Sequence, residues 1–131
     1  MEIRCDLATI AISETRDHQL IMLRERNGQR LLHIVIGLAE ALAIDRRVKG
    51  MNPPRPMTHE LLANIIEQLD AELEKIVISD LQSGTFFAKL VIRRNGEITE
   101  VDSRPSDAIA LGVATEVPIY VEEHVLRDAA Q

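Results

Sequence analysis

Two short stretches of the chain combine residue types that could perform acid–base chemistry. The first is RPMTH, from Arg55 to His59, and the second is RPSDA, which begins at Arg104 and contains Asp107. Each places an arginine, which binds anions, shortly before an ionisable side chain. A histidine at the start of a helix can act as a general base. The alternative is that His59 is a helix-start residue with a solvated ring.

Two carboxylates, Glu40 and Asp107, lie 67 residues apart, each near the start of an apolar run that predicts a helix. If the two halves of the chain fold alike, the pair could hold Mg²⁺ or Mn²⁺, or act as acid and base, in phosphodiester hydrolysis. The alternative is structural, because carboxylates are favoured in the first turn of a helix. Glu14 and Asp80 form a second equivalent pair, for which a role in a turn is the simpler interpretation.

Four cations lie in the segment DRRVKGMNPPRPMTH, directly before His59, and could bind a phosphate backbone. The alternative is the solvated end of a helix, where cations are also favoured. Arg104 stands apart, and we expect it to form a salt bridge with Asp102 or Asp107, or to hold a phosphate. The four clustered cations are Arg46, Arg47, Lys49 and Arg55.

The composition limits the class of protein. A chain of 131 residues is one domain with room for a core. A net charge of −6 disfavours nucleic-acid binding except through a local basic patch. No apolar run is long enough to cross a membrane and the N-terminus is not typical of an export signal, so we expect a cytoplasmic protein. Cys5 has no second cysteine to pair with, and we expect it to be buried in a strand.

The chain contains an internal repeat. IAIS and IVIS start 66 residues apart, and the two Asn-Gly pairs that follow them are 68 residues apart. Three landmarks in the same order, at nearly constant offset, predict a duplication. The repeats are 1–50 and 73–117, separated by a linker loop and helix at 51–72 and followed by a strand and tail at 118–131, all approximate bounds within one domain, 1–131.

Each repeat predicts three strands and a helix, with a two-residue type I′ turn at Asn27-Gly28 and at Asn95-Gly96. We therefore expect an α+β fold, in which duplicated β-β-β-α units form a curved, mostly antiparallel sheet covered by helices. The second repeat helix is apolar on nearly all sides, so it should be buried. The expected elements are 3–12, 19–26, 31–36 and helix 38–48, then 73–80, 85–93, 97–103 and helix 105–115.

The linker predicts an amphipathic helix over 59–71, with Thr58 as its N-cap. Of the remaining histidines, His33 lies in the apolar strand LLHIVI and predicts a packed core residue, whereas His18 and His124 predict loop or surface positions. The repeat aligns Asp107 with Glu40 rather than with His59. RPMTH and RPSDA are therefore two different helix starts, which could still face one cleft.

The motifs IVIGLAEALAI, PPRPMTHELL, ISDLQSGTFFAKL and VDSRPSDAIAL resemble the bifunctional nuclease domain family over nearly the whole chain. The resemblance implies a duplicated α+β fold, combined DNase and RNase activity as in plant members that carry extra segments, and an oligomer. Glu60 stands where the family often has Asp. The residues that match the family's motifs are Glu40, Arg55, Thr58, His59, Asp80, Asp102, Arg104, Ser106 and Asp107.

Two functions remain open from the sequence. The first is a nuclease acting on DNA and RNA, in which a divalent metal on the carboxylates could assist, cations bind phosphate and His59 activates water. The second is a non-catalytic interaction or regulatory module that forms a homo-oligomer, with a dimer favoured. The family favours the first, whereas the negative charge, the few aromatic residues and the absence of a Gly-rich loop, CxxC, HExxH or GxSxG motif favour the second.

Overall fold

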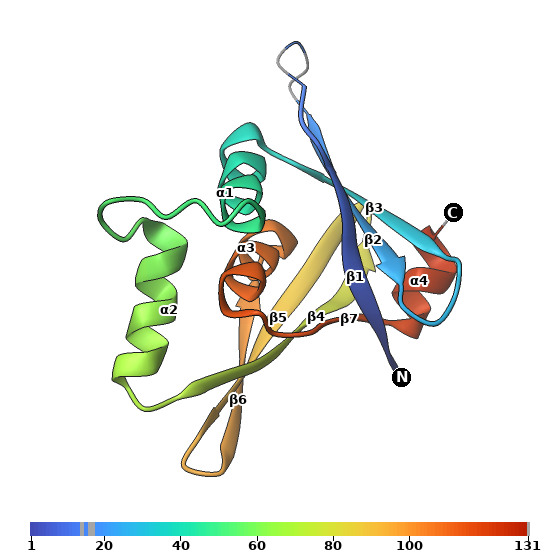
Figure 1. Cartoon of the computed structure of the whole chain (residues 1–131). Helices are drawn as coiled ribbons and strands as arrows, with labels where there is room; N and C mark the ends of the chain where they lie inside the picture. Colours follow the sequence, from blue (N-terminus) through green and yellow to red (C-terminus); the bar gives the residue numbers. More distant parts are fainter. Residues whose placement is uncertain (14, 16–17, 131) are drawn as a thin grey trace.

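A computed structural model describes residues 1–13, 15 and 18–130 (Figure 1). Its seven strands form one sheet in the order β3-β2-β1-β7-β4-β5-β6. Among the described residues, β4 and β7 are the one parallel pair, and the other neighbours are antiparallel. The elements are β1 Glu2–Ala11, β2 Gln19–Glu25, β3 Leu31–Ile36, α1 Leu38–Val48, α2 Thr58–Gln68, β4 Glu72–Gln82, β5 Thr85–Arg94, β6 Glu97–Ser103, α3 Pro105–Thr115, β7 Ile119–Glu122 and α4 Glu123–Ala129.

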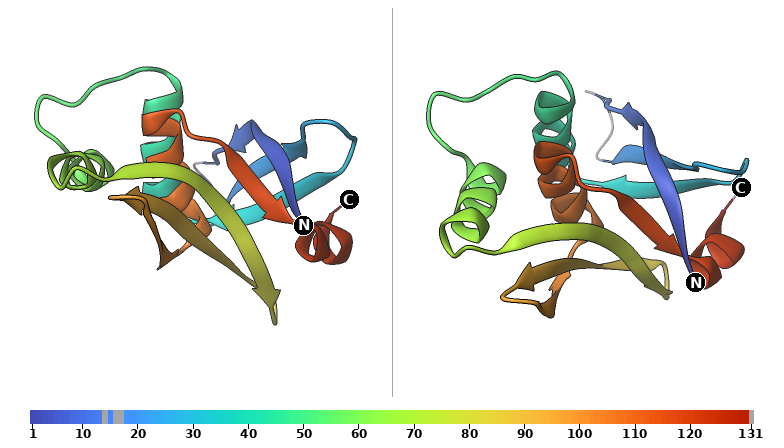
Figure 2. Two further views of the ribbon diagram at one scale, coloured as in Figure 1. Left: turned by 90° about the horizontal axis from the view of Figure 1, so that it is seen from below. Right: turned by 60° about the horizontal axis from the view of Figure 1, so that its bottom comes forward.

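The predicted α+β class and the mostly antiparallel sheet are confirmed. Both halves have the predicted order of three strands and a helix, and β7 joins them by pairing with β1 on one side and β4 on the other. The duplication behind this shared order stays a prediction. Figure 2 shows α1, α2 and α3 gathered on one side of the curved sheet, with α4 at the other end beside the N-terminus.

The core lies between the sheet and the two repeat helices. Alternate residues of β3 face it, because successive strand side chains point to opposite faces of a sheet. Helix α3 is buried as predicted, and Gly112 lets it lie close to β4, since a Cβ there would be 3.3 Å from the Ile76 Cδ1 atom. Cys5 is buried in β1, and this burial raises the pKa of its thiol to about 11.

The two Asn-Gly pairs fold differently. Asn95 and Gly96 both have positive φ, 52° and 78°, as the predicted type I′ turn requires. The prediction for Asn27-Gly28 is wrong, because β2 ends at Glu25 and β3 begins at Leu31, which leaves a five-residue loop. An ion pair closes this longer loop: Arg30 Nη2 donates to Glu25 Oε2 at 3.0 Å.

The linker helix begins one residue earlier than predicted, and Thr58 is not its N-cap. Met57 takes that position, and its backbone N–H donates to Glu60 Oε1 at 3.0 Å. The Glu60 carboxylate therefore performs the capping that we assigned to the Thr58 hydroxyl. The helix ends at Gln68 rather than near residue 71, and the chain then turns through Asp70, whose φ is 56°.

Two other expectations are corrected. His33 is not a core histidine, because it alternates with the buried Leu32 and Ile34 and is half-buried on the opposite face of β3. The predicted tail contains helix α4, which buries Val125 and Leu126 and is tied to the first half by an ion pair from Arg30. Within the described residues, no helix is long and apolar enough to cross a membrane.

Candidate active site

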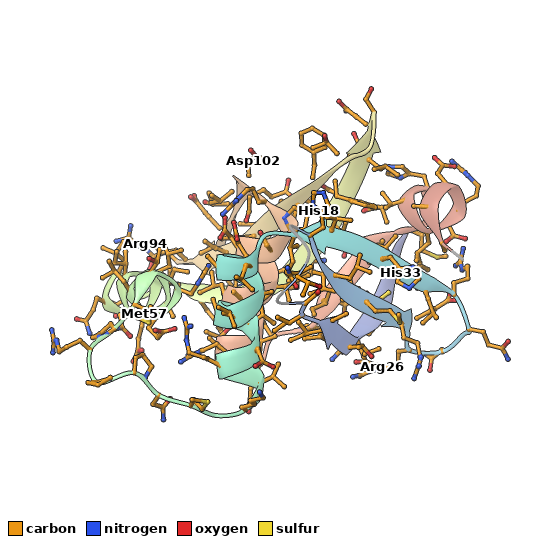
Figure 3. All side chains as sticks on the ribbon, turned by 90° about the horizontal axis from the view of Figure 1, so that it is seen from above. His18, Arg26, His33, Met57, Arg94 and Asp102 are labelled. Atoms are coloured by element: carbon orange, nitrogen blue, oxygen red, sulfur yellow. The ribbon has the colours of Figure 1, made fainter. Side chains whose placement is uncertain are left out.

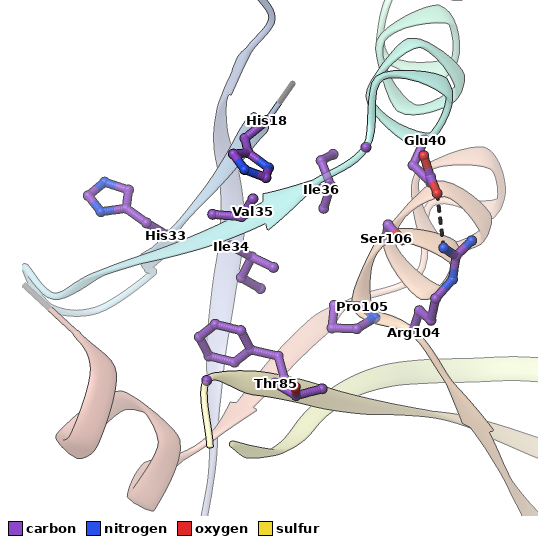
Figure 4. A pocket seen from close by; sticks show the side chains of 13 residues that line it. His18, His33, Ile34, Val35, Ile36, Glu40, Thr85, Arg104, Pro105 and Ser106 are labelled. Atoms are coloured by element: carbon purple, nitrogen blue, oxygen red, sulfur yellow. Dashed lines mark hydrogen bonds and ion pairs between the residues drawn. The ribbon is translucent and has the colours of Figure 1, made fainter. Parts of the chain in front are cut away.

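The first turns of α1 and α3 meet at a shared arginine. Arg104 donates from Nε to Asp107 Oδ2 at 2.8 Å and from Nη2 to Asp107 Oδ1 at 3.2 Å. Its Nη1 donates to Glu40 Oε1 at 2.9 Å, the dashed contact in Figure 4. One guanidinium therefore joins the two carboxylates that the repeat alignment paired.

The local sequence explains this arrangement. Arg104 is the N-cap of α3 and is extended (φ −72°, ψ 147°), as expected for a residue before a proline. Pro105 is the first helical residue, where its missing N–H breaks no hydrogen bond. Asp107 and Glu40 each lie in the first turn of their helix, and α1 packs against α3. The side chains therefore meet at the N-terminal ends of both helices.

His59 reaches the same cluster from the linker helix. Its Nε2 lies 3.1 Å from Asp107 Oδ1, and its side chain is only 13% exposed. When the neutral imidazole donates from Nε2, the lone pair is on Nδ1. Nδ1 has no hydrogen-bond partner in the described part of the chain. We call His59, Asp107, Arg104 and Glu40 the helix-start network.

The network controls the charge of its members. Burial alone would raise the pKa of Asp107, but hydrogen bonds from Arg104 and His59 outweigh it and lower that pKa below its usual value. The hydrogen bonds to Asp107 and Glu40 raise the pKa of Arg104. Asp107 therefore stays ionised at neutral pH and can orient the His59 ring as an acceptor.

The carboxylates do not fit a resident divalent metal as they stand. The Arg104 guanidinium binds both Glu40 and Asp107, so a cation between them would have to displace it. No group of three or more His, Cys, Asp or Glu side chains suited to a metal occurs within the described ranges. The chemistry derived below therefore uses this chain's own side chains.

The basic cluster lies outside the helix-start network. Arg47 pairs with Glu60 at 3.5 Å and Lys49 with Asp45 at 2.8 Å, at the C-terminal end of α1. Arg46 contacts the Met57 sulfur, and Arg55 is exposed in the loop before α2. Figure 3 shows Met57 and this loop on the far side of the molecule from His18 and His33.

The remaining motif residues are dispersed. Thr58 is exposed at the start of α2, and Asp102 is exposed on the edge strand β6. Asp80 lies in β4, where the Gln82 amide and the Leu81 N–H lower the pKa of its carboxyl. Asp80 also accepts from His124 Nε2 at 3.4 Å, which makes a second His–Asp pair away from the network. Its proposed equivalent, Glu14, lies outside the described residues.

A cleft of about 440 Å³ opens beside the network, bordered by β3, β5 and the first turns of α1 and α3 (Figure 4). Glu40 and Arg104 belong to both the cleft and the network. Ser106, a predicted motif residue, also lines the cleft. The sequence interpretation missed three of the lining residues, for which period-two alternation in β3 and the Phe-Phe pair were the available signals. These are His18, His33 and Phe86.

Comparison with known proteins assigns the family. The model of the bifunctional nuclease domain matches residues 21–131. The Mycobacterium tuberculosis protein named Uncharacterized protein Rv1829 is 44% identical over 120 residues, covering 92% of this chain and 71% of the relative. Bifunctional nuclease 2 of Oryza sativa subsp. japonica is 27% identical, covering 84% and 35%. Bifunctional nuclease 1 of Arabidopsis thaliana is 24% identical, covering 82% and 34%. The chain that carries the helix-start network thus belongs to the bifunctional nuclease domain family.

Proposed function

We propose that this chain is a nuclease that hydrolyses phosphodiester bonds of DNA and RNA at the helix-start network. The observation that carries the proposal is the His59–Asp107 contact beside an arginine that is 64% exposed and borders a cleft. A histidine held by a carboxylate can accept a proton from a nucleophile. The family assignment, and the names of the plant relatives, support the same reaction class.

Each member of the network has a role in this proposal. Nδ1 of His59 takes a proton from water as the water oxygen attacks phosphorus, while Asp107 holds the imidazole through Nε2. Arg104, positioned by Glu40, stabilises the negative charge that develops on the phosphoryl oxygens. The P–O bond to the leaving oxygen breaks, and that oxygen takes a proton from solvent. The basic cluster around Arg47 and Arg55 would bind the backbone farther from the reacting phosphate.

The test is cleavage of single-stranded RNA and DNA oligonucleotides by the purified protein. We expect activity in the wild type and its loss in a His59→Ala/Asp107→Ala double variant that retains the wild-type melting temperature. The matched control is His124→Ala/Asp80→Ala, which removes the other His–Asp pair and should remain active. Activity that survives in the first double variant would identify a contaminating nuclease. Parallel reactions with EDTA, Mg²⁺ and Mn²⁺ test whether cleavage requires a metal.

A second candidate function, a homo-oligomeric interaction module, is favoured by the surface of α2. None of the eleven described residues of this helix is buried. Ala63 and Ile66 face the core, whereas the apolar side chains on the adjacent stripe are 40–52% exposed. We call this the α2 stripe: Leu61, Leu62, Ile65 and Leu69.

We propose a second copy of the chain as the partner of the α2 stripe, with the two α2 helices antiparallel. Exposed Arg55 precedes α2, and exposed Glu67 and Asp70 lie at its C-terminal end. No ion pair reaches these three side chains within the described ranges. An antiparallel pair would bring each Arg55 near the partner's acidic end, so that the charges complement each other across the apolar seam.

Ile65→Glu is expected to dissociate this dimer, because it places a charge in the apolar seam. Asn64→Glu adds the same charge on the opposite face of α2 and serves as the matched control. Light scattering during gel filtration should give twice the 14.7 kDa chain mass for the wild type and the control, and the chain mass for Ile65→Glu. The dissociation constant should rise by about 100-fold or more. A wild-type protein that elutes as a monomer would contradict the assignment.

A further inference from the structure

We propose that the cleft beside the helix-start network binds one unpaired nucleotide, with its phosphate at the N-terminus of α3 and its base against Phe86. The inference rests on the proposed nuclease function, because Arg104 and Glu40 belong to both the cleft and the network. It adds a substrate class to that function: a single strand, one nucleotide of which leaves the stack and enters the protein.

Ser106 is the observation that points to a ligand. Its side chain lies in the first turn of α3 and lines the cleft, although the residue is only 5% exposed. Its hydroxyl makes no hydrogen bond within the described residues. Figure 4 shows Ser106 on the cleft side of α3, facing β3. A buried hydroxyl without a partner is unfavourable unless a ligand or water completes its hydrogen bonding.

The backbone around Ser106 favours an anion as that ligand. The first intrahelical backbone bond of α3 runs from Ala108 N–H to the Arg104 carbonyl, and no side chain caps the helix. The N–H groups of Ser106 and Asp107 are therefore free, at the positive end of the helix dipole. With the Ser106 hydroxyl and the Arg104 guanidinium, they provide the donors that bind a phosphate at a helix N-terminus.

The equivalent end of α1 is less suited to a phosphate, although Gly37 also lines the cleft. The Glu40 carboxylate folds back over Gly37, so closely that a Cβ on this glycine would collide with it. Its negative charge already occupies the N-terminus of α1. The asymmetry selects the α3 end as the phosphate position and leaves Glu40 to hold Arg104.

The other wall of the cleft suits a base. Phe86 is half-buried at the start of β5, and Val35 and Ile36 of β3 face the same space. An aromatic ring is a sequence-tolerant stacking surface for an unpaired base, and His33 and Thr85 supply polar groups at the base edge. A cleft of about 440 Å³ falls in the size range of small-ligand sites. A base in a duplex is stacked and paired, so only an unpaired one can enter.

The test measures binding of adenosine monophosphate, adenosine and inorganic phosphate to the full chain by NMR titration. We expect the monophosphate to bind at least about 10-fold more tightly than either fragment, with shifts at Ser106 and Phe86. Ser106→Ala should weaken the monophosphate and phosphate by about 10-fold, the effect of losing a hydrogen bond to a charged group. Phe86→Leu should weaken the monophosphate and leave phosphate unchanged. Phe87→Leu is the matched control, because Phe87 does not line the cleft.

The outcomes separate this inference from the proposed function. If phosphate binds as tightly as the monophosphate, or if no probe shifts the cleft residues, the nucleotide assignment is overturned. Cleavage without monophosphate binding would reject the cleft and leave the nuclease proposal standing. Monophosphate binding that depends on Ser106 and Phe86, in a protein that cleaves nothing, would support the cleft and reject the nuclease.

Discussion

Replacing Asp107 with asparagine is expected to slow nucleic-acid cleavage by about 10²- to 10⁴-fold, the usual contribution of a positioned acid–base group. The Asp107 carboxylate accepts from His59 Nε2 and from two nitrogens of Arg104. An asparagine amide has nearly the same shape but one oxygen, and its NH₂ group would face donors. The imidazole would then lose its fixed tautomer, and the guanidinium its two-point contact.

The matched control for this variant is Asp80→Asn. Asp80 contacts His124 in the second His–Asp pair, so the control makes the same chemical change outside the network. The turnover rate should fall only in Asp107→Asn, and both proteins should keep the wild-type circular dichroism spectrum. Equal rates in the two variants would show that the His59–Asp107 contact serves structure alone.

The same variant has a distinct pH signature in stability. The folded-state pKa of Asp107 is lowered, so its ionisation stabilises the fold above the unfolded pKa of about 4. This contribution is lost as the pH falls through the lowered folded-state pKa. Asparagine does not titrate, so the difference in unfolding free energy between wild type and variant should be largest near neutral pH and shrink below about pH 4. Urea denaturation at several pH values measures it.

Hydrophobic periodicity and turn residues were sufficient to predict the elements of this fold, because both are local signals. The ranges of α1 and α3 match the structure, and the β strands differ from it only near their ends. The errors arose where a non-local contact won. Arg30 pairs with Glu25 and turns Asn27-Gly28 into part of a longer loop. His33 sits in an apolar strand, but the pleat places it on the outer face.

The site was predictable only in part. The repeat indicated that Glu40 and Asp107 are equivalent, and the helix-start motif singled out His59, but their proximity depends on how three helices pack. Arg104 shows why the bridging group was missed. Its contact with Asp107 spans one helical turn and was anticipated, whereas its contact with Glu40 crosses 64 residues. No local pattern encodes that second contact.

Replacing Arg104 with methionine is expected to lower cleavage by about 10²- to 10³-fold, comparable to the loss of one oxyanion-stabilising donor. The change keeps much of the apolar stem and removes the guanidinium. Glu40 and Asp107 would then face each other without a cation, so we expect the free energy of unfolding to fall by about 1 kcal/mol, a modest amount because Arg104 is 64% exposed. Lysine should not restore activity, because a single ammonium cannot reproduce the planar two-point contact.

Arg26→Met is the matched control for this change. Arg26 also donates to an aspartate from Nε and Nη2, at 3.1 and 2.6 Å, but contacts Asp6 far from the network. A second variant separates catalysis from repulsion: adding Glu40→Gln to Arg104→Met relieves the repulsion between carboxylates and should recover stability. If Arg104 acts on the reacting phosphate, the double variant stays inactive at restored stability. If Arg104 only holds α1 against α3, cleavage returns together with stability, and the arginine loses its place in the proposed chemistry.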